Sequence, residues 1–284
     1  FVAAMGRLFS NNPERGLFRS DDGGLSWTNK LFLNDSTGAI DLAVHPLNPD
    51  TVYAVTWERL RRPHKRQYGG PGSAIHRSTD GGESWTKLSG GFPQGSLGRI
   101  GISIAPSSPN TLYATVADET GYFLNTYKSQ NHGNSWTTMA GQSNPFYSSF
   151  GWWFGQIRAH PADANRVYNL GVLWVTTADG GSSWTQMPGD LHVDHHALYI
   201  HPAIPNFMVE GNDGGVYISH NGGASWTLHP LPIIQFYTSE IDFQQPQRLY
   251  GGTQDNGTWR STDADPDIWE HIWGGDGFVT LVNP

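Results

Sequence analysis

The sequence contains no cysteine among its 284 residues, and this absence excludes two kinds of structure. Without cysteine the chain cannot form a disulfide framework, and it cannot bind a metal ion through thiolate sulfur. Charge is also scarce, because only 15% of the residues are Asp, Glu, Lys or Arg, and the formal net charge is −8. An acidic chain of this kind is a poor partner for nucleic acid, so we expect no nucleic-acid binding.

Long apolar runs are missing as well. No stretch of about 20 apolar residues occurs, so we expect no membrane span. Glycine (35 residues), proline (18) and tryptophan (12) are abundant instead, and aromatic residues make up 13% of the chain. This composition is too aromatic for disorder and rich in turn-forming residues, as many short strands require.

One short motif recurs along the whole chain. Its pattern is Ser/Thr-x-Asp/Asn-x-Gly-x-x-Trp, and it is clearest at residues 78–85. The third position of the motif is occupied by Asp22, Asp80, Asn131, Asp179, Asn221 and, in a degenerate copy, Asp263. The tryptophans of successive copies lie 58, 51, 48, 42 and 43 residues apart. A repeat of roughly 40–50 residues is typical of solenoids, propellers and arrays.

The chemistry of the motif predicts a tight turn. An Asp or Asn side chain can accept a hydrogen bond from the backbone two residues on, and glycine adopts positive φ without steric cost. The residues on either side, such as 74–77 and 84–88, alternate between apolar and polar as half-buried strands do. We therefore expect each copy to be a β-hairpin whose tryptophan packs into the neighbouring repeat, with a structural role and not a chemical one.

A second pattern precedes each motif: an apolar strand ending in proline, a short turn, and another strand, as in residues 40–46 and 51–55. Together with the hairpin this gives four antiparallel strands per repeat, which is the content of a propeller blade. We predict an all-β fold, a single β-propeller domain of six blades over residues 1–284. Residues 278–284 read as a strand that could pair with residues 1–4 and close the ring, which would remove exposed sheet edges. Alternatively, the chain is part of a larger propeller.

The motif is that of the Asp-box, or BNR repeat, which sialidases, sortilin-type propellers and xyloglucanase-type glycoside hydrolases share. The chain as a whole resembles secreted bacterial proteins described as sortilin-like or as BNR-repeat glycosyl hydrolases. Segments that carry this resemblance include residues 4–7, 192–197, 211–215 and 274–278. The resemblance implies an extracellular or periplasmic propeller. The arginine triad and the Arg-Ile-Pro segment of sialidases are not visible, which disfavours sialidase activity.

Propeller geometry predicts where a functional site would lie. Loops that join one blade to the next, and loops that join the second strand of a blade to the third, open on the face opposite the repeated turns. Polar and aromatic residues outside the motif gather in or beside these connections, and such a channel mouth is a typical ligand site. Our candidate binding residues are His192, His195, His196, Asp41, Glu58, Arg59, Arg7, Arg99, Trp152 and Trp153. The aromatic run at residues 145–154 either stacks on sugar rings or packs beneath a loop.

Four aspartates in these connections are candidates for catalysis: Asp194, Asp213, Asp255 and Asp276. Paired carboxylates with different pKa values are what glycoside hydrolysis uses, whereas turn formation is the alternative role for an aspartate among glycines. The same region could bind a divalent metal ion through His192, Asp194 and His196, although the spacing matches no zinc motif. On a strand, Asp194 and His196 would face one way and His195 the other. We predict no other cofactor.

Two functions remain open at this stage. In the first, the propeller is a non-catalytic module that holds a polysaccharide, a peptide or another domain of a larger secreted protein. In the second, it is a glycoside hydrolase-like enzyme that acts on a polysaccharide. Because the sequence shows no certain catalytic pair, we predict the first. Two carboxylates about 5–10 Å apart at an open channel mouth would favour the second. It would be excluded if Asp41, Asp213, Asp255 and Asp276 each bonded only their own turn.

Overall fold

The computed structural model describes residues 1–140, 150–204, 206–231, 233–262, 265 and 268–283. All regular secondary structure in these ranges is β-strand, in 25 strands, which confirms the predicted all-β class. No helix in this part of the chain has the length and apolar character needed to span a membrane.

The strands form six sheets in chain order, and consecutive strands pair antiparallel within each sheet. The first sheet has three strands: β1 (Val2–Ala4), β2 (Gly16–Arg19) and β3 (Thr28–Leu31). The second contains β4 (Thr37–Val44), β5 (Val52–Glu58), β8 (Ala74–Ser78) and β9 (Thr86–Lys87). The third contains β10 (Leu97–Ile104), β11 (Leu112–Asp118), β12 (Phe123–Ser129) and β13 (Thr137–Thr138).

The remaining sheets repeat this four-stranded plan. The fourth contains β14 (Gln156–His160), β15 (Asp163–Leu170), β16 (Val175–Thr177) and β17 (Thr185–Gln186). The fifth contains β18 (His195–Ile200), β19 (Met208–Asn212), β20 (Gly215–Ser219) and β21 (Thr227–His229). The sixth contains β22 (Phe236–Ile241), β23 (Leu249–Thr253), β24 (Thr258–Ser261) and β25 (Trp269–Trp273). A separate hairpin, β6 (Leu60–Arg62) with β7 (Lys65–Gln67), projects from the second sheet.

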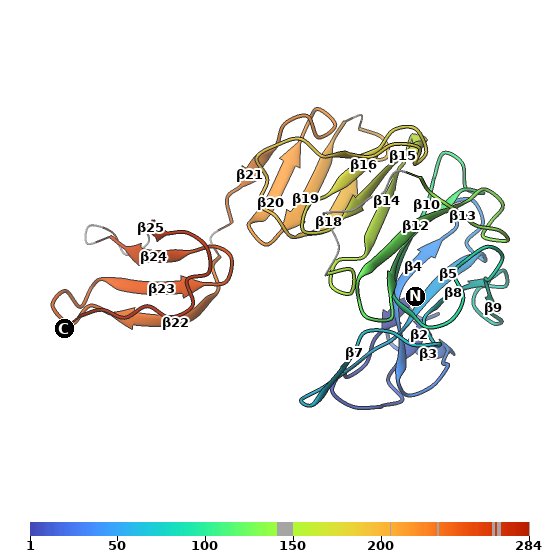
Figure 1. Cartoon of the computed structure of the whole chain (residues 1–284), viewed down its shortest axis with the longest axis horizontal. Helices are drawn as coiled ribbons and strands as arrows, with labels where there is room; N and C mark the ends of the chain where they lie inside the picture. The colour runs from blue at the N-terminus through green and yellow to red at the C-terminus, as the bar shows by residue number, and fades with distance from the viewer. Residues whose placement is uncertain (141–149, 205, 232, 263–264, 266–267, 284) are drawn as a thin grey trace.

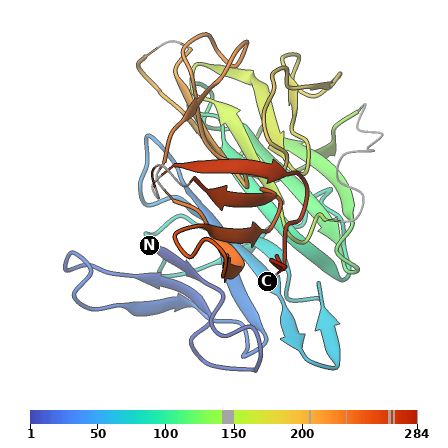
Figure 2. The same ribbon diagram turned by 90° about the vertical axis from the view of Figure 1, so that its left-hand side faces the viewer.

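The sheets follow an open arc and not a closed ring (Figure 1). β1 pairs with β2, and residues 278–283 contain no strand, so the predicted closure between the chain ends is wrong for this structure. The termini are far apart, and the sixth sheet stands at the end of the arc (Figure 1). Seen from that end, the sixth sheet lies in front of the others (Figure 2). The described residues therefore contain one three-stranded and five four-stranded sheets in place of the six complete blades that we predicted.

The repeated motif folds as the predicted turn. Ser78 Oγ donates to Asp80 Oδ1 at 2.7 Å and accepts from the backbone N–H of Gly82 at 2.8 Å. Asp80 accepts in turn from the N–H of Ser84 at 2.9 Å. The same three bonds recur around Asp22, Asn131, Asp179 and Asn221, whereas Asp263 lies outside the described residues.

Four tryptophans of the motif, from Trp85 to Trp226, pack between successive sheets as predicted, whereas Trp27 of the first copy is 46% exposed. Trp136 is 4% exposed and belongs to an apolar cluster that contains Tyr53 and Leu88 of the preceding repeat. Trp184 and Trp226 occupy the equivalent place one and two repeats later. The second to fifth sheets thus each bury apolar surface against the sheet before them, which is how stacked repeats stabilise one another.

The two ends of every sheet are chemically different. We call the end with the repeated turns the turn end, and the opposite end, where β18 begins and β19 turns into β20, the loop end. Close to the loop end the pairing register shifts in β4, β10, β18 and β22. Such bulges bend a strand and redirect its side chains. The functional candidates lie at this end.

Candidate functional site

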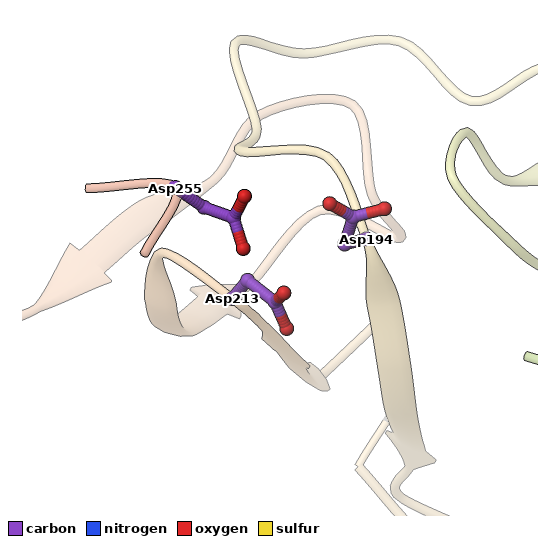
Figure 3. Close-up of side chains that lie close together, drawn as sticks. All are labelled: Asp194, Asp213 and Asp255. Atoms are coloured by element: carbon purple, nitrogen blue, oxygen red, sulfur yellow. The ribbon is translucent and has the colours of Figure 1, made fainter. Parts of the chain in front are cut away.

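Three carboxylates meet at the loop end of the fifth and sixth sheets. Asp194 immediately precedes β18, Asp213 lies in the turn between β19 and β20, and Asp255 lies in the connection from β23 to β24. One carboxylate oxygen from each lies within 4.8 Å of the other two. Figure 3 shows the three side chains around a common point, although 61 residues separate Asp194 from Asp255 in the sequence.

A second group of polar side chains surrounds these carboxylates. His196 Nε2 lies 2.8 Å from Asp213 Oδ1. Asp276 Oδ1 accepts a hydrogen bond of 2.9 Å from the backbone N–H of Asp255. All four aspartates predicted to be catalytic therefore lie together. Asp213 and Asp255 carry their carboxyl groups toward each other, so the condition that would have excluded an enzyme, each aspartate bonding only its own turn, is not met.

The backbone at these positions is shaped by local hydrogen bonds. Asp213 occupies a two-residue turn in which Asn212 Oδ1 accepts from the N–H of Gly214 at 2.9 Å. A side chain at 214 would meet His192, since a Cβ there would lie 2.5 Å from His192 Cβ. Asn256 Nδ2 donates to the carbonyl of Asp213 at 2.8 Å, which ties the connection in the sixth sheet to the turn in the fifth.

Asp194 and Asp255 both adopt left-handed backbone conformations, with φ of +68° and +60°. This conformation is uncommon for residues other than glycine, and Asp tolerates it better than most. At Asp194 it is held by a hydrogen bond of 2.9 Å from its N–H to the carbonyl of Val172. The next residues carry the bulge of β18, where His195 is opposite Asn212 and Ala197 is opposite Gly211, leaving His196 as the extra residue.

The carboxylates perturb one another electrostatically. Burial, a hydrogen bond to Asp213 and the negative charge of Asp276 raise the pKa of Asp255 to about 6. Burial and the negative charge of Asp213 also raise the pKa of Asp194, against the opposing effect of His192 and His196. Contact with the neighbouring carboxyl group favours the protonated form of Asp255. Asp255 can therefore hold a proton up to about pH 6 and release it to a bound molecule.

The three carboxylates are also the residues that could ligate a metal ion. In the described part of the chain, Asp194, Asp213 and Asp255 are the group of acidic and histidine side chains close enough to do so. Their donors are all oxygen, which suits a hard cation such as Ca²⁺ or Mg²⁺. The set shares Asp194 with the predicted ligands, but His196 is paired with Asp213 and His192 Nδ1 lies 3.0 Å from the carbonyl of Val193.

Aromatic side chains border the carboxylates. The ring of Trp153, 48% exposed, stands edge-on to His196 with 6.1 Å between ring centroids. Trp152 packs against Trp153, and the guanidinium of Arg59 lies 5.2 Å from the Trp152 ring centroid. Trp153 is thus an exposed apolar surface next to the carboxylate site, and His196 lies between its ring and Asp213. Residues 145–149 of the predicted aromatic run lie outside the described residues.

Three predicted binding residues support the site from beneath and do not face a ligand. His195 is 3% exposed and its Nδ1 lies 2.6 Å from Glu210 Oε1, so it is not available to a ligand at the surface. This agrees with the prediction that His195 faces away from Asp194 and His196. Arg59 is buried beneath Tyr68 and Trp152, and Arg99 donates to the carbonyl of Trp153.

The other three candidates serve local structure. Asp41 accepts hydrogen bonds from the N–H groups of Leu42 and of Ile102 in the neighbouring sheet, and burial raises its pKa. Glu58 accepts from the N–H of Gly72. Arg7 forms an exposed ion pair with Glu14.

Sequence reasoning missed Glu210, which is completely buried beside the site. Its signal was the strand pattern itself. Met208 is buried two residues before it on β19, and side chains two apart share a face of a strand, so a carboxylate at 210 points into the core. A charged residue at an inward-facing position requires polar partners, so the alternation in β19 indicates that Glu210 is paired inside the protein.

No family model matches the chain. Curated relatives are nevertheless similar over most of it: a xyloglucanase of a Paenibacillus species is 24% identical over 335 aligned positions, covering 95% of this chain and 30% of the relative. Xyloglucanase Xgh74A of Acetivibrio thermocellus is 23% identical, covering 83% and 32%. The chain thus spans about a third of the length of these relatives.

Solved structures share the fold. An ancestral GH74 enzyme has a TM-score of 0.55 and 19% sequence identity, and covers 92% of this chain and 36% of its own. The GH74 xyloglucanase of Xanthomonas campestris, at 15% identity and a TM-score of 0.45, covers 90% and 45%. The successive four-stranded antiparallel sheets and the likeness to the ancestral enzyme show a β-propeller fold.

Proposed function

We propose that this chain carries the polysaccharide-binding and proton-donating site of a glycoside hydrolase-like propeller, and that its substrate class is a xyloglucan-type polysaccharide. The observation that carries the proposal is the convergence of Asp194, Asp213 and Asp255 at the loop end. The similarity to xyloglucanases over 95% and 83% of this chain supports the substrate class. The sequence alone favoured a non-catalytic binding module, and we now favour the enzyme in its place.

Asp255 is the proton donor in this proposal. Its contact with Asp213 favours the protonated form of Asp255, and the pKa of Asp255 of about 6 makes that proton available to the leaving oxygen of a glycosidic bond. His196 lies against the other side of Asp213 and keeps that carboxylate oriented. Asp194 supplies negative charge next to the reacting bond, where an oxocarbenium-like transition state becomes positive. Water forms the new bond to the anomeric carbon as the glycosidic bond breaks, and its proton passes to the carboxylates, which restores the proton that Asp255 gave.

The spacing defines how these carboxylates act. Oxygens within 4.8 Å of one another are closer than the roughly 6.5–9.5 Å that an inverting pair requires for a water molecule between them. This spacing therefore does not suit an inverting arrangement of Asp213 and Asp255. Trp153, exposed beside His196, provides a face on which a sugar ring can stack.

The test is hydrolysis by the purified full chain. We expect release of reducing ends from xyloglucan, with little release from polysaccharides of other backbones, and loss of that release in Asp255→Asn. Sugar binding by calorimetry in the same preparations separates catalysis from recognition. Binding of xyloglucan oligosaccharides without any hydrolysis would contradict the catalytic proposal and favour a non-catalytic binding module. The exposed ring of Trp153 also suits that function. Because a polysaccharide does not enter the cytoplasm, the proposal also places the protein outside it.

A further inference from the structure

Glu210 lies in the interior beside the carboxylate site, and both of its oxygens are used. Its side chain is fully buried, with 0% exposure. Oε1 lies 2.6 Å from His195 Nδ1, and Oε2 accepts a hydrogen bond of 2.9 Å from Asn212 Nδ2. A carboxylate removed from water is tolerated when its oxygens are paired in this way, so the two partners are held in place as firmly as Glu210 itself.

The two partners of Glu210 are direct sequence neighbours of the site residues. His195 lies between Asp194 and His196, and Asn212 precedes Asp213. His195 and Asn212 are also opposite each other in the pairing of β18 with β19. One buried carboxylate therefore fixes the two backbone segments that carry three of the polar groups at the loop end.

Each segment is fixed by a chain of contacts. On the first, the His195 ring stacks on the buried ring of Trp174 at 5.4 Å, and the N–H of His195 donates to the carbonyl of Gly171 at 2.9 Å. On the second, Asn212 uses its amide nitrogen for Glu210 and its oxygen for the N–H of Gly214, which closes the turn around Asp213. If Glu210 lost either oxygen, one segment would be free to relax.

We infer that Glu210 is a positioning residue of the carboxylate site, which sets the placement of Asp194 and Asp213 through His195 and Asn212. The inference rests on the proposed function in one respect, that a misplaced Asp213 or Asp194 slows hydrolysis. Its geometric part, the control of the two segments by one side chain, is independent of any activity.

Glu210→Gln tests the inference with almost no change of shape, because the new amide keeps one acceptor oxygen and turns a donor toward one of its two partners. In the active protein we expect kcat to fall by about 10- to 100-fold, since a displacement of about 1 Å can cost about 100-fold in rate. KM should change less than kcat, because Trp153 is held by Trp152 and by Arg99, which donates to its carbonyl, as well as by His196. Amide hydrogen exchange should become faster at residues 192–196 and 212–214 and stay unchanged in the second and third sheets.

Two further variants make the result decisive. Asn212→Ala breaks one arm of the network and should speed exchange at 212–214 while leaving 192–196 protected. His76→Ala removes a buried polar side chain of the second sheet, 6% exposed and bonded to Thr56, and should lower the melting temperature without changing kcat. Folded Glu210→Gln with wild-type kcat and wild-type exchange would overturn the inference. If the wild-type protein hydrolyses nothing, the proposed function fails alone, and the exchange pattern still decides the role of Glu210.

Discussion

Aspartates at the two ends of the sheets have opposite environments. At the turn end, Asp22, Asp80 and Asp179 each accept hydrogen bonds from a hydroxyl and from backbone N–H groups of their own turn, and these bonds lower their pKa values. At the loop end, Asp194 and Asp255 face other carboxylates, and burial together with negative charge raises their pKa values. An aspartate carboxylate is therefore stabilised in its ionised form at the turn end and destabilised in that form at the loop end.

This difference separates structure from function. A carboxylate that stays ionised and hydrogen-bonded to its own turn stabilises that turn, and it has no proton to donate to a ligand. A group of carboxylates that oppose one another costs stability, and proteins keep such arrangements chiefly at functional sites. The repeated turns therefore account for the fold, and the loop end is where activity should be sought.

The largest expected effect is on hydrolysis. We predict that Asp255→Asn lowers kcat by about 100- to 10,000-fold, the usual contribution of a general acid. Asp80→Asn is the matched control, because Asn already occupies the equivalent position at 131 and 221. It should leave kcat unchanged. Equal losses in both variants, measured by reducing-end assay on folded protein, would remove the distinction between the two ends.

The next effect concerns stability at the turn end. Ser78 is 1% exposed and its oxygen accepts from the N–H of Gly82, so Ser78→Ala leaves a buried donor without its acceptor. We predict a loss of about 1–3 kcal/mol in the free energy of unfolding, measured by urea denaturation. Activity of the remaining folded protein should be unchanged. A Ser78→Ala protein of wild-type stability would show that the turn bonds contribute little.

A smaller effect is expected from the aromatic border of the site. Trp153→Ala removes the exposed ring beside His196 and should raise KM for the polysaccharide by about 2- to 10-fold, in line with the energy of one aromatic contact. Its kcat should stay within twofold of wild type. Trp27, exposed at the turn end, is the matched control, and Trp27→Ala should not change KM. A kcat effect in Trp153→Ala with unchanged KM would argue that the ring positions His196 and does not stack on sugar.

The smallest effect is a pH-dependent gain in stability. Because the pKa of Asp255 is about 6 against an ordinary 3.8, the folded state binds more protons between these values, and stability falls as pH rises through this window. Asp255→Asn should therefore be more stable than wild type at pH 8, by about 1 kcal/mol once solvent screening is allowed for, and equal to it near pH 4. Thermal melts at the two pH values measure this. Lower stability of the variant at pH 8 would mean that the carboxylates do not repel.

Much of the fold could be read from the sequence because the information is local. The bonds of each turn join residues two and four positions apart, such as Ser78 with Asp80 and Gly82, so the motif alone determines the hairpin. Alternation of apolar residues predicted the strands on either side. Ring closure could not be read in this way. Residues 278–283 have the composition of a strand, but a strand requires a partner edge, and β1 is not beside them.

The sequence by itself determined the class of the molecule: repeated turns, four-stranded sheets, and the end of the sheets where chemistry should lie. It also named Asp194, Asp213, Asp255 and Asp276 as candidates. Only the tertiary structure decided that these four meet, that His196 reaches Asp213, and that Glu210 is paired with both His195 and Asn212. The physical reason is distance along the chain. Short-range hydrogen bonds follow from neighbouring residues, whereas a site assembled from positions 61 residues apart depends on how the fifth and sixth sheets meet at their loop ends.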